Sequence, residues 1–172
     1  EVSNLGAAMH MFGSSGWTQV GFNDKNGQFR QFYMELTDPY FISGFDINIV
    51  EGRDFDPDLE IDKRESIIIN EAAAKYFFGT EDPIGKKLPG DDFGPHTIIG
   101  VTEDFNFRSL HTEVEPLIIA QNGEPILQGI SDITINSNPD PKVFFRYNGK
   151  NLLGVQDILE ETWTKLFPNE EM

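Results

Sequence analysis

Six acidic side chains between positions 54 and 65 come closest to the spacing of a chemical site. They occupy positions 1, 3, 5, 7, 9 and 12 of an EF-hand-like calcium loop: Asp54, Asp56, Asp58, Glu60, Asp62 and Glu65. Against a calcium site, Leu59 stands where that loop needs glycine, Pro57 stiffens the segment, and no helix precedes it. A solvated acidic loop is therefore favoured, with calcium binding from Asp54 to Glu65 as the alternative, and no metal site is predicted.

Nucleophiles and ligand pairs are not apparent elsewhere. His10, His96 and His111 are scattered and lack the close spacing of two ligands on one helix or hairpin. Cysteine is absent, and so are the Gly-x-Ser-x-Gly and phosphate-binding glycine motifs. We therefore predict no catalytic residue and no cofactor, and binding residues stay unassigned.

One segment combines carboxylates with aromatic residues. Glu103 and Asp104 are adjacent at an expected strand end, so their side chains should point to opposite faces instead of forming an acid–base pair. Phe105, Phe107 and Leu110 follow, and such residues are more often part of a core than of an exposed partner surface. The core interpretation is favoured, and the partner surface is the alternative.

Composition excludes several classes of partner and of protein. The 172 residues hold 13 Lys and Arg against 29 Asp and Glu, a net charge of -16 that repels nucleic acid. A hydrophobic content of 38% is enough for a buried core. The longest apolar runs, at 67–69 and 117–120, are far shorter than a membrane-spanning helix. Because the chain begins at Glu1 without methionine or a signal-like segment, we expect it to be a piece of a longer protein.

Short strands and turns dominate the first half of the expected structure. The turn at 23–27, with its Asn-Gly pair, predicts a hairpin between residues 17–22 and 28–36. Asp38 and Pro39 fit the N-cap and first position of a short helix. The β-branched run at 66–69 predicts a strand buried on both faces, Asn70 caps a helix over 71–78, and Gly79 ends that helix.

The second half predicts more strands and one long helix. A turn and short strand are expected at 82–88, and further strands at 97–102, 116–120, 130–135 and 142–147. From Leu152 to Leu166, apolar residues recur mostly every three or four positions, so one stripe of a helix should face a core. The predicted fold class is therefore α+β.

Five sequence blocks, in order, resemble the periplasmic core domain of MacB/FtsX-like ABC transporter permeases, especially the large permeases common in Bacteroidetes. The blocks cover nearly the whole chain and are least clear between 121 and 141. They are Glu1-Val2-Ser3; Asp38-Pro39-Tyr40-Phe41 with Glu51-Gly52-Arg53-Asp54-Phe55; residues 68–75 with Asp82-Pro83-Ile84-Gly85-Lys86; residues 98–111 with Pro116; and the helix with Trp163, Leu166, Phe167 and Pro168.

The resemblance implies a two-lobed, non-catalytic domain. Residues 1–37 with 140–172 would form a βαβ-like, membrane-proximal porter lobe, and residues 38–139 a β-rich, sabre-like lobe. The domain would lie on the periplasmic side of the bacterial inner membrane, within an integral membrane protein. It would relay ATP-driven movement so that a cargo is exported or released.

The implied partners are the flanking transmembrane helices of the same permease, a cytoplasmic ATPase that binds the ATP, and a periplasmic adaptor or second permease domain. The alternative from another class is a free-standing extracellular module that binds a peptide, a glycan or calcium. A hydrolase is disfavoured because no nucleophile or acid–base pair is visible.

Overall fold

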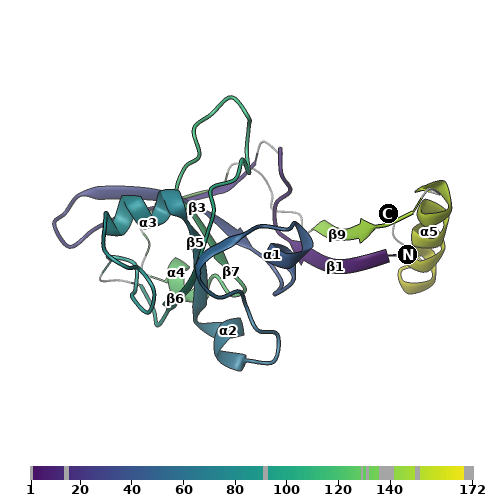
Figure 1. Ribbon diagram of the computed structural model, residues 1–172, viewed down its shortest axis with the longest axis horizontal. Coiled ribbons are helices and arrows are strands. Elements are labelled where there is room, and N and C mark those ends of the chain that lie inside the picture. Colours follow the sequence, from purple (N-terminus) through teal and green to yellow (C-terminus); the bar gives the residue numbers. More distant parts are fainter. Residues whose placement is uncertain are drawn as a thin grey trace. The chain divides into compact units, whose positions relative to one another are not determined.

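A computed structural model describes residues 2–13, 16–90, 93–128, 130, 132–135, 142–149 and 152–168. The chain divides into two compact units, one of Glu1–Ser3 with Arg146–Met172 and one of Asn4–Phe145. Helices and both parallel and antiparallel strand pairs occur (Figure 1). The predicted α+β class is confirmed.

The larger unit is built on a mixed seven-stranded sheet. Its strand order is β4-β6-β5-β7-β3-β2-β8. Two neighbouring pairs, β5 with β6 and β3 with β7, are parallel, and the others are antiparallel. The strands are β2 (Thr18–Asn23), β3 (Phe29–Leu36), β4 (Ile49–Gly52), β5 (Ser66–Asn70), β6 (Thr97–Thr102), β7 (Leu117–Ala120) and β8 (Asp132–Ile135).

Two hydrophobic clusters cover the two faces of this sheet. In β5, Ile67 and Ile69 belong to one cluster and Ile68 to the other, as the alternation of a strand requires. All five residues of β5 are buried, so the predicted doubly buried strand is confirmed. The first cluster includes residues of helix α3 (Glu71–Phe78), and the second includes Phe41 and Ile42 of helix α1 (Phe41–Gly44).

Asn70 joins β5 to α3 as the sequence predicts. Its side-chain Oδ1 accepts hydrogen bonds from the backbone N–H of Ala73 (3.0 Å) and of Leu117 (2.9 Å). Its amide Nδ2 donates to the carbonyl of Glu115 (3.0 Å). The residue is fully buried, and the two bonds that it accepts are made away from water. One side chain therefore caps the helix and holds the start of β7.

Replacing Asn70 with alanine is expected to lower the free energy of unfolding by about 1 to 2 kcal/mol, because a cap is lost and two buried backbone groups lose their partner. Urea denaturation would measure this. Asn122→Ala is the control, because the side chain of Asn122, just before α4 (Glu124–Leu127), accepts one exposed hydrogen bond from the backbone N–H of Glu124, and its loss should cost about 0.5 kcal/mol. Equal losses in the two variants would contradict the role given to Asn70.

Other local predictions are also confirmed. The hairpin forms, with β2 and β3 antiparallel around the turn at 24–28. The helix after Asn70 ends at Gly79, whose φ is 65°. Strands occupy 97–102, 117–120, 132–135 and 142–147. No helix in the described ranges is long and apolar enough to cross a bilayer.

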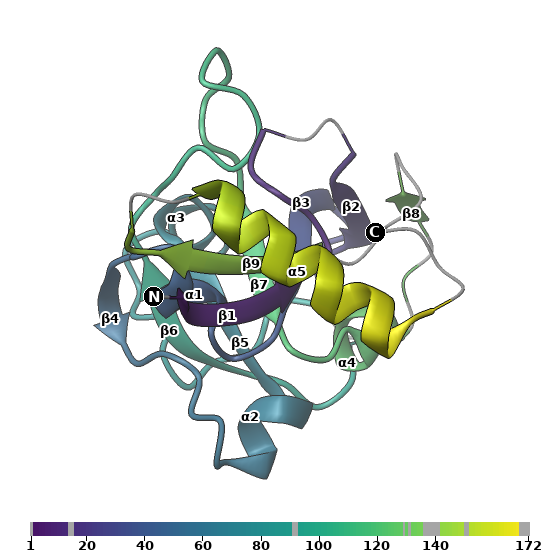
Figure 2. The same cartoon turned by 90° about the vertical axis from the view of Figure 1, so that its right-hand side faces the viewer.

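The predicted C-terminal helix is α5 (Leu152–Leu166), which belongs to the smaller unit (Figure 2). Its Val155 is buried, but Ile158 and Leu166 are 63% and 67% exposed. The expectation that the whole stripe faces a core is wrong for these two residues. The unit is too short a piece of chain to cover every side of a helix. A separate two-stranded sheet pairs β1 (Val2–Ala8) with β9 (Lys142–Tyr147).

Asp38 was predicted to be a helix N-cap, and this is wrong. Helix α1 begins at Phe41, with Tyr40 in the cap position and no side-chain cap bond. Asp38 instead accepts hydrogen bonds from the backbone N–H of Tyr40 (3.0 Å) and of Ala7 (2.7 Å). The Asp38 carboxylate therefore makes a tertiary hydrogen bond to the β1 backbone instead of capping the helix.

The expected short strand at 82–88 does not form, because these residues make turns. In these turns the backbone N–H of Ile84 donates to the side chain of Asp82, and that of Lys86 donates to the carbonyl of Pro83. The backbone N–H of Gly85 donates to the carbonyl of Ile98 in β6. The expected division into a membrane-proximal and a sabre-like lobe stays a prediction, and its boundary at 139 and 140 lies outside the described residues. In the structure, β2 and β3 share one sheet with β5, β6 and β7.

Candidate functional site

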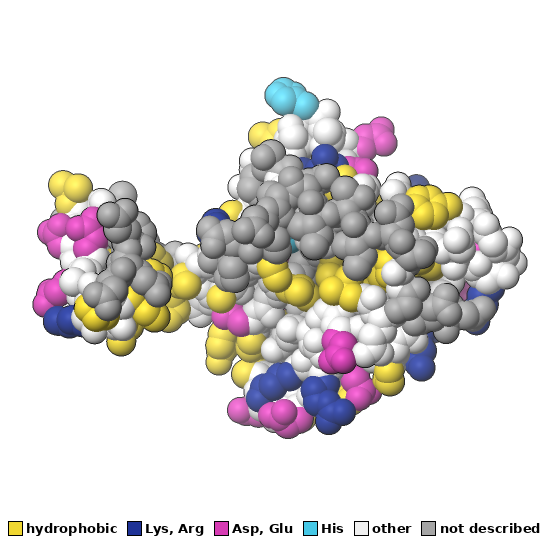
Figure 3. Space-filling view, turned by 180° about the vertical axis from the view of Figure 1, so that it is seen from behind, with side chains coloured by type: hydrophobic (Ala, Val, Ile, Leu, Met, Phe, Trp, Pro, Cys, Tyr) yellow, Lys and Arg dark blue, Asp and Glu magenta, His cyan; other side chains and the backbone are white. Residues whose placement is uncertain are grey.

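The loop between β6 and β7, residues 103–116, is the most prominent projection of the larger unit (Figure 1). Figure 3 shows it from behind, with histidine, hydrophobic and acidic side chains at its tip. Leu110 is 82% exposed, and its neighbours Ser109 and His111 are exposed too. The tip is thus open to a partner.

Both ends of this loop are tied to the start of α3. The carboxylate of Asp104 accepts a hydrogen bond from Ala72 N–H (2.9 Å), and the carboxylate of Glu71 accepts one from Asp104 N–H (3.2 Å). At the other end, Asn70 holds the carbonyl of Glu115. The start of a helix supplies free N–H groups and favours negative charge, which suits the Asp104 carboxylate.

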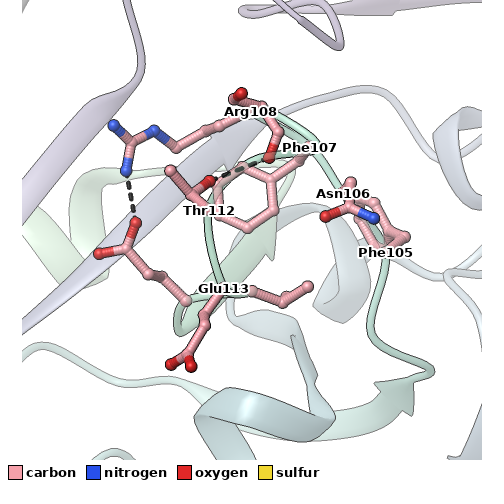
Figure 4. Close-up of a pocket in the computed structure, with 9 residues that line it drawn as sticks. Phe105, Asn106, Phe107, Arg108, Thr112 and Glu113 are labelled. Atoms are coloured by element: carbon pink, nitrogen blue, oxygen red, sulfur yellow. Dashed lines mark hydrogen bonds and ion pairs between the residues drawn. The ribbon is translucent and has the colours of Figure 1, made fainter.

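Aromatic packing anchors the middle of the loop. Phe107 is buried and lies edge-on to Trp17 (4.7 Å between ring centroids) and to Tyr33 (5.6 Å). Arg108 donates to the Tyr33 hydroxyl (2.6 Å) and lies over the Tyr33 ring. It also forms an ion pair with Glu115, drawn as a dashed line from Arg108 in Figure 4. Burial raises the pKa of Tyr33, and Glu115 adds to this effect while Arg108 opposes it. The hydroxyl therefore stays protonated at neutral pH.

The hollow enclosed by this loop is too small for a substrate. Its volume is about 10 Å³, room for one water molecule at most. Of the labelled residues around it, Phe105 packs against Phe107, and Thr112 donates to the Ser109 carbonyl in a turn (Figure 4). The geometry favours a rigid contact element over a binding pocket.

The aromatic segment 105–110 fits the core interpretation in part and the exposed partner surface in part. Phe107 belongs to the core, as favoured, and Phe105 packs against the same cluster. Leu110 does not, because it lies at the exposed tip. Glu103 and Asp104 are both exposed, and Asp104 is engaged by α3.

A buried His10–Glu35 pair was not predicted from the sequence. Glu35 is fully buried in β3, and its carboxylate accepts bonds from the His10 backbone N–H and ring Nδ1, both at 2.9 Å. His10 also stacks on Trp17 (5.0 Å). Burial raises the pKa of Glu35, and the bonds from His10 oppose that rise. The pair fastens the residues just after β1 to β3. The signal that could have revealed it was Glu35, the one charged residue between Phe32 and Leu36 in β3.

The acidic segment from Asp54 to Glu65 folds around an arginine. Helix α2 (Glu60–Arg64) occupies part of it, and Asp62 is fully buried. Arg53 donates to both carboxylate oxygens of Asp62 (2.5 and 2.9 Å). The Arg53 bonds, supported by bonds from Asp56 N–H and Ser66, lower the Asp62 pKa to about 2.

The described residues of this segment do not bring together a set of carboxylates that could bind calcium, the alternative considered for it. Across the described ranges, no three His, Cys, Asp or Glu side chains gather where they could hold a metal ion. Over α2, basic and acidic side chains alternate on the surface (Figure 3). Asp56, Asp58 and Glu60 are exposed, as a solvated loop predicts, but Asp62 is not.

The two remaining histidines are separated. His96 is buried, its ring accepts a bond from Leu88 N–H (2.8 Å), and burial lowers its pKa, so it is a neutral structural residue. His111 is exposed on the projecting loop. The structure does not bring the three histidines together.

Three solved structures share this arrangement, each with a TM-score of 0.58. The periplasmic region of MacB from Actinobacillus actinomycetemcomitans is 16% identical over 93% of this chain and 66% of its own. A domain assigned to a permease protein from Porphyromonas gingivalis is 16% identical over 95% and 70%. The extracellular domain of the ABC-type transporter YknZ from Gram-positive bacteria is 13% identical over 99% and 79%.

The fold is therefore that of the extracytoplasmic domains of ABC-type transporters. The chain belongs to the family of MacB-like periplasmic core domains, whose model matches residues 3–138. It spans just under two thirds of the MacB periplasmic region. No curated protein matches it by sequence.

Proposed function

We propose that this domain is the non-catalytic, periplasmic part of an ABC transporter permease of the Bacteroidetes type. In this role it relays ATP-driven movement across the inner membrane to export or release a cargo. Its partners are the flanking transmembrane helices, a cytoplasmic ATPase that binds the ATP, and a periplasmic adaptor or second permease domain. The family match over residues 3–138 carries this proposal.

The connections at the two ends of the chain support a mechanical role. The first residues and the last helix fall in one compact unit, so membrane helices joined to both would act on the same unit. Just after β1, the backbone N–H of Met9 donates to the Leu36 carbonyl (2.8 Å), and His10 pairs with Glu35. A displacement of β1 would therefore be passed directly to β3 and its sheet.

The fixed loop between β6 and β7 fits the same role. A contact element that pushes a partner must not yield, and this loop is held at both ends and at its middle. Its exposed tip at Leu110 is the part that would touch a partner.

ATP binding is expected to change the distance between spin labels placed on the two units. Because the chain has no cysteine, introduced cysteines would be the only thiols of the domain. Labels at the exposed residues Gln156 and Lys63 report on α5 and on the larger unit. The full-length permease and its ATPase, in proteoliposomes, would be measured by pulsed EPR with and without ATP and vanadate.

A second label pair provides the control. Gln31 and Lys63 are both exposed and both lie in the larger unit, so their separation should stay constant. An unchanged Gln156–Lys63 separation in an active transporter would contradict the mechanical relay. A gene product without apolar runs of about 20 residues beside this domain would instead favour the free-standing binding module.

A further inference from the structure

β4 is the strand at one edge of the seven-stranded sheet (Figure 2). An open groove lies beside it. Its volume is about 580 Å³. In the described chain, β4 pairs with β6 on one side only. The groove is formed by β4, β6, α3 and the segment 79–83 that follows α3. All of these belong to the larger unit.

The groove has an apolar floor. Val50, Ala74, Pro83 and Val101 line it, and Val50 is 42% exposed on the edge strand. Consecutive strand residues normally point to opposite faces, but β4 has a register shift between Ile49 and Glu51. Val50 and Glu51 consequently both line the groove.

The rim of the groove is acidic. Four carboxylates line it against one Lys side chain, Lys75. Glu81 is paired with Lys86 (2.7 Å), which neutralises part of this charge. The net charge of the chain, -16, has the same sign and would draw a cationic partner from a distance. The acidic residues are Glu51, Glu71, Glu81 and Asp82.

We propose that this groove binds an extended, basic segment of another protein, added as a strand to the open edge of β4. An edge strand presents backbone N–H and C=O groups to a new strand. Every second side chain of that strand would face the groove, where apolar ones would pack on the floor and Lys or Arg would meet the acidic rim. A polyamine could satisfy the charge but not the backbone or the floor. The proposal goes beyond the transport role and does not depend on ATP-driven movement.

Binding of a synthetic peptide tests this proposal. The probe is a fluorescein-labelled peptide of about eight residues that carries Val and Lys or Arg at every second position, on one face, with Thr between them. It is titrated with the 172-residue chain while anisotropy is recorded. We expect saturable binding that weakens several-fold between about 50 and about 500 mM salt. A peptide with Glu in place of every basic residue should not bind.

Matched variants locate the site. Glu51→Lys reverses one charge of the rim and should weaken binding about tenfold. Glu60→Lys makes the same charge change on α2, outside the groove, and should leave binding unchanged. Circular dichroism would confirm that both variants are folded. Equal weakening by the two substitutions would overturn the proposal, because only net charge would then matter.

Hydrogen exchange distinguishes strand addition from simple charge attraction. In the peptide complex, amides of β4 (Ile49–Gly52) should exchange more slowly, with little change in α2. Absence of this protection, complete displacement of the peptide by equimolar spermidine, or no binding to the unaltered chain at low salt would each overturn the proposal.

Discussion

Replacing Gly52 with alanine is expected to lower the free energy of unfolding by about 3 to 5 kcal/mol, the largest effect predicted for this domain. Gly52 has φ of 74°, where a Cβ is strained. An added Cβ would also lie 2.2 Å from the carbonyl oxygen of Ile99 in the paired strand β6. That oxygen belongs to the sheet backbone and cannot rotate away. Guanidinium denaturation monitored by tryptophan fluorescence would measure the loss.

Gly85→Ala separates the two causes. Gly85 has nearly the same φ, 77°, but a Cβ there would meet no atom within 4 Å. The Gly85→Ala substitution should lower the free energy of unfolding by only about 1 kcal/mol, because backbone strain is its only cost. If both variants lost the same stability, the close approach of β4 and β6 at Gly52 would not be the cause.

Replacing Asp62 with asparagine should lower the free energy of unfolding by about 2 to 3 kcal/mol. The charge-assisted bonds from Arg53 weaken, and the backbone N–H of Asp56 and the Ser66 hydroxyl lose a charged acceptor. Arg53 is nearly half exposed and can recover water, which keeps the loss below that of a fully buried pair. Glu60→Gln, which breaks an exposed pair with Lys63, should change stability by less than about 0.5 kcal/mol. Urea denaturation would compare the two.

The lowered pKa of Asp62 also predicts how the free energy of unfolding changes at acid pH. Its pKa falls from 3.8 to about 2 on folding, so the folded state favours the ionised form. The stabilisation is present above about pH 4 and is lost as the pH falls toward 2. It amounts to about 1 to 2 kcal/mol after allowance for the exposure of Arg53. The Asp62→Asn variant should lose less stability than the parent chain over that interval, and parallel curves would contradict this assignment.

Elements with short-range signals could be predicted from the sequence. Ser66 to Gly79 forms the expected strand, cap and helix because a β-branched run, an asparagine and a terminal glycine act over a few residues. The hairpin around residues 24–28 is confirmed for the same reason. Asp38 shows where such local prediction fails. Its carboxylate resembled a helix cap in the sequence, but it accepts a hydrogen bond from the backbone of Ala7, which is distant in sequence.

The candidate site was only partly predictable. The segment from Ile98 to His111 stood out by its resemblance to a family, and the family is confirmed. Its attachment to α3 depends on Asn70, which lies 45 residues before Glu115. The pairing of His10 with Glu35 likewise joins residues 25 positions apart. No local pattern specifies which distant polar groups will share a buried position.

By itself, the sequence determined the α+β class, most of the strands, the capped helix α3 and the family, because these depend on local periodicity, capping and ordered motifs. Only the tertiary structure decided that Arg53 neutralises Asp62, that Leu110 is exposed while Phe107 is buried, and that β4 borders an acidic groove. The physical reason is that burial and charge pairing depend on which segments the sheet brings together, and strand order in that sheet does not follow the order of the chain.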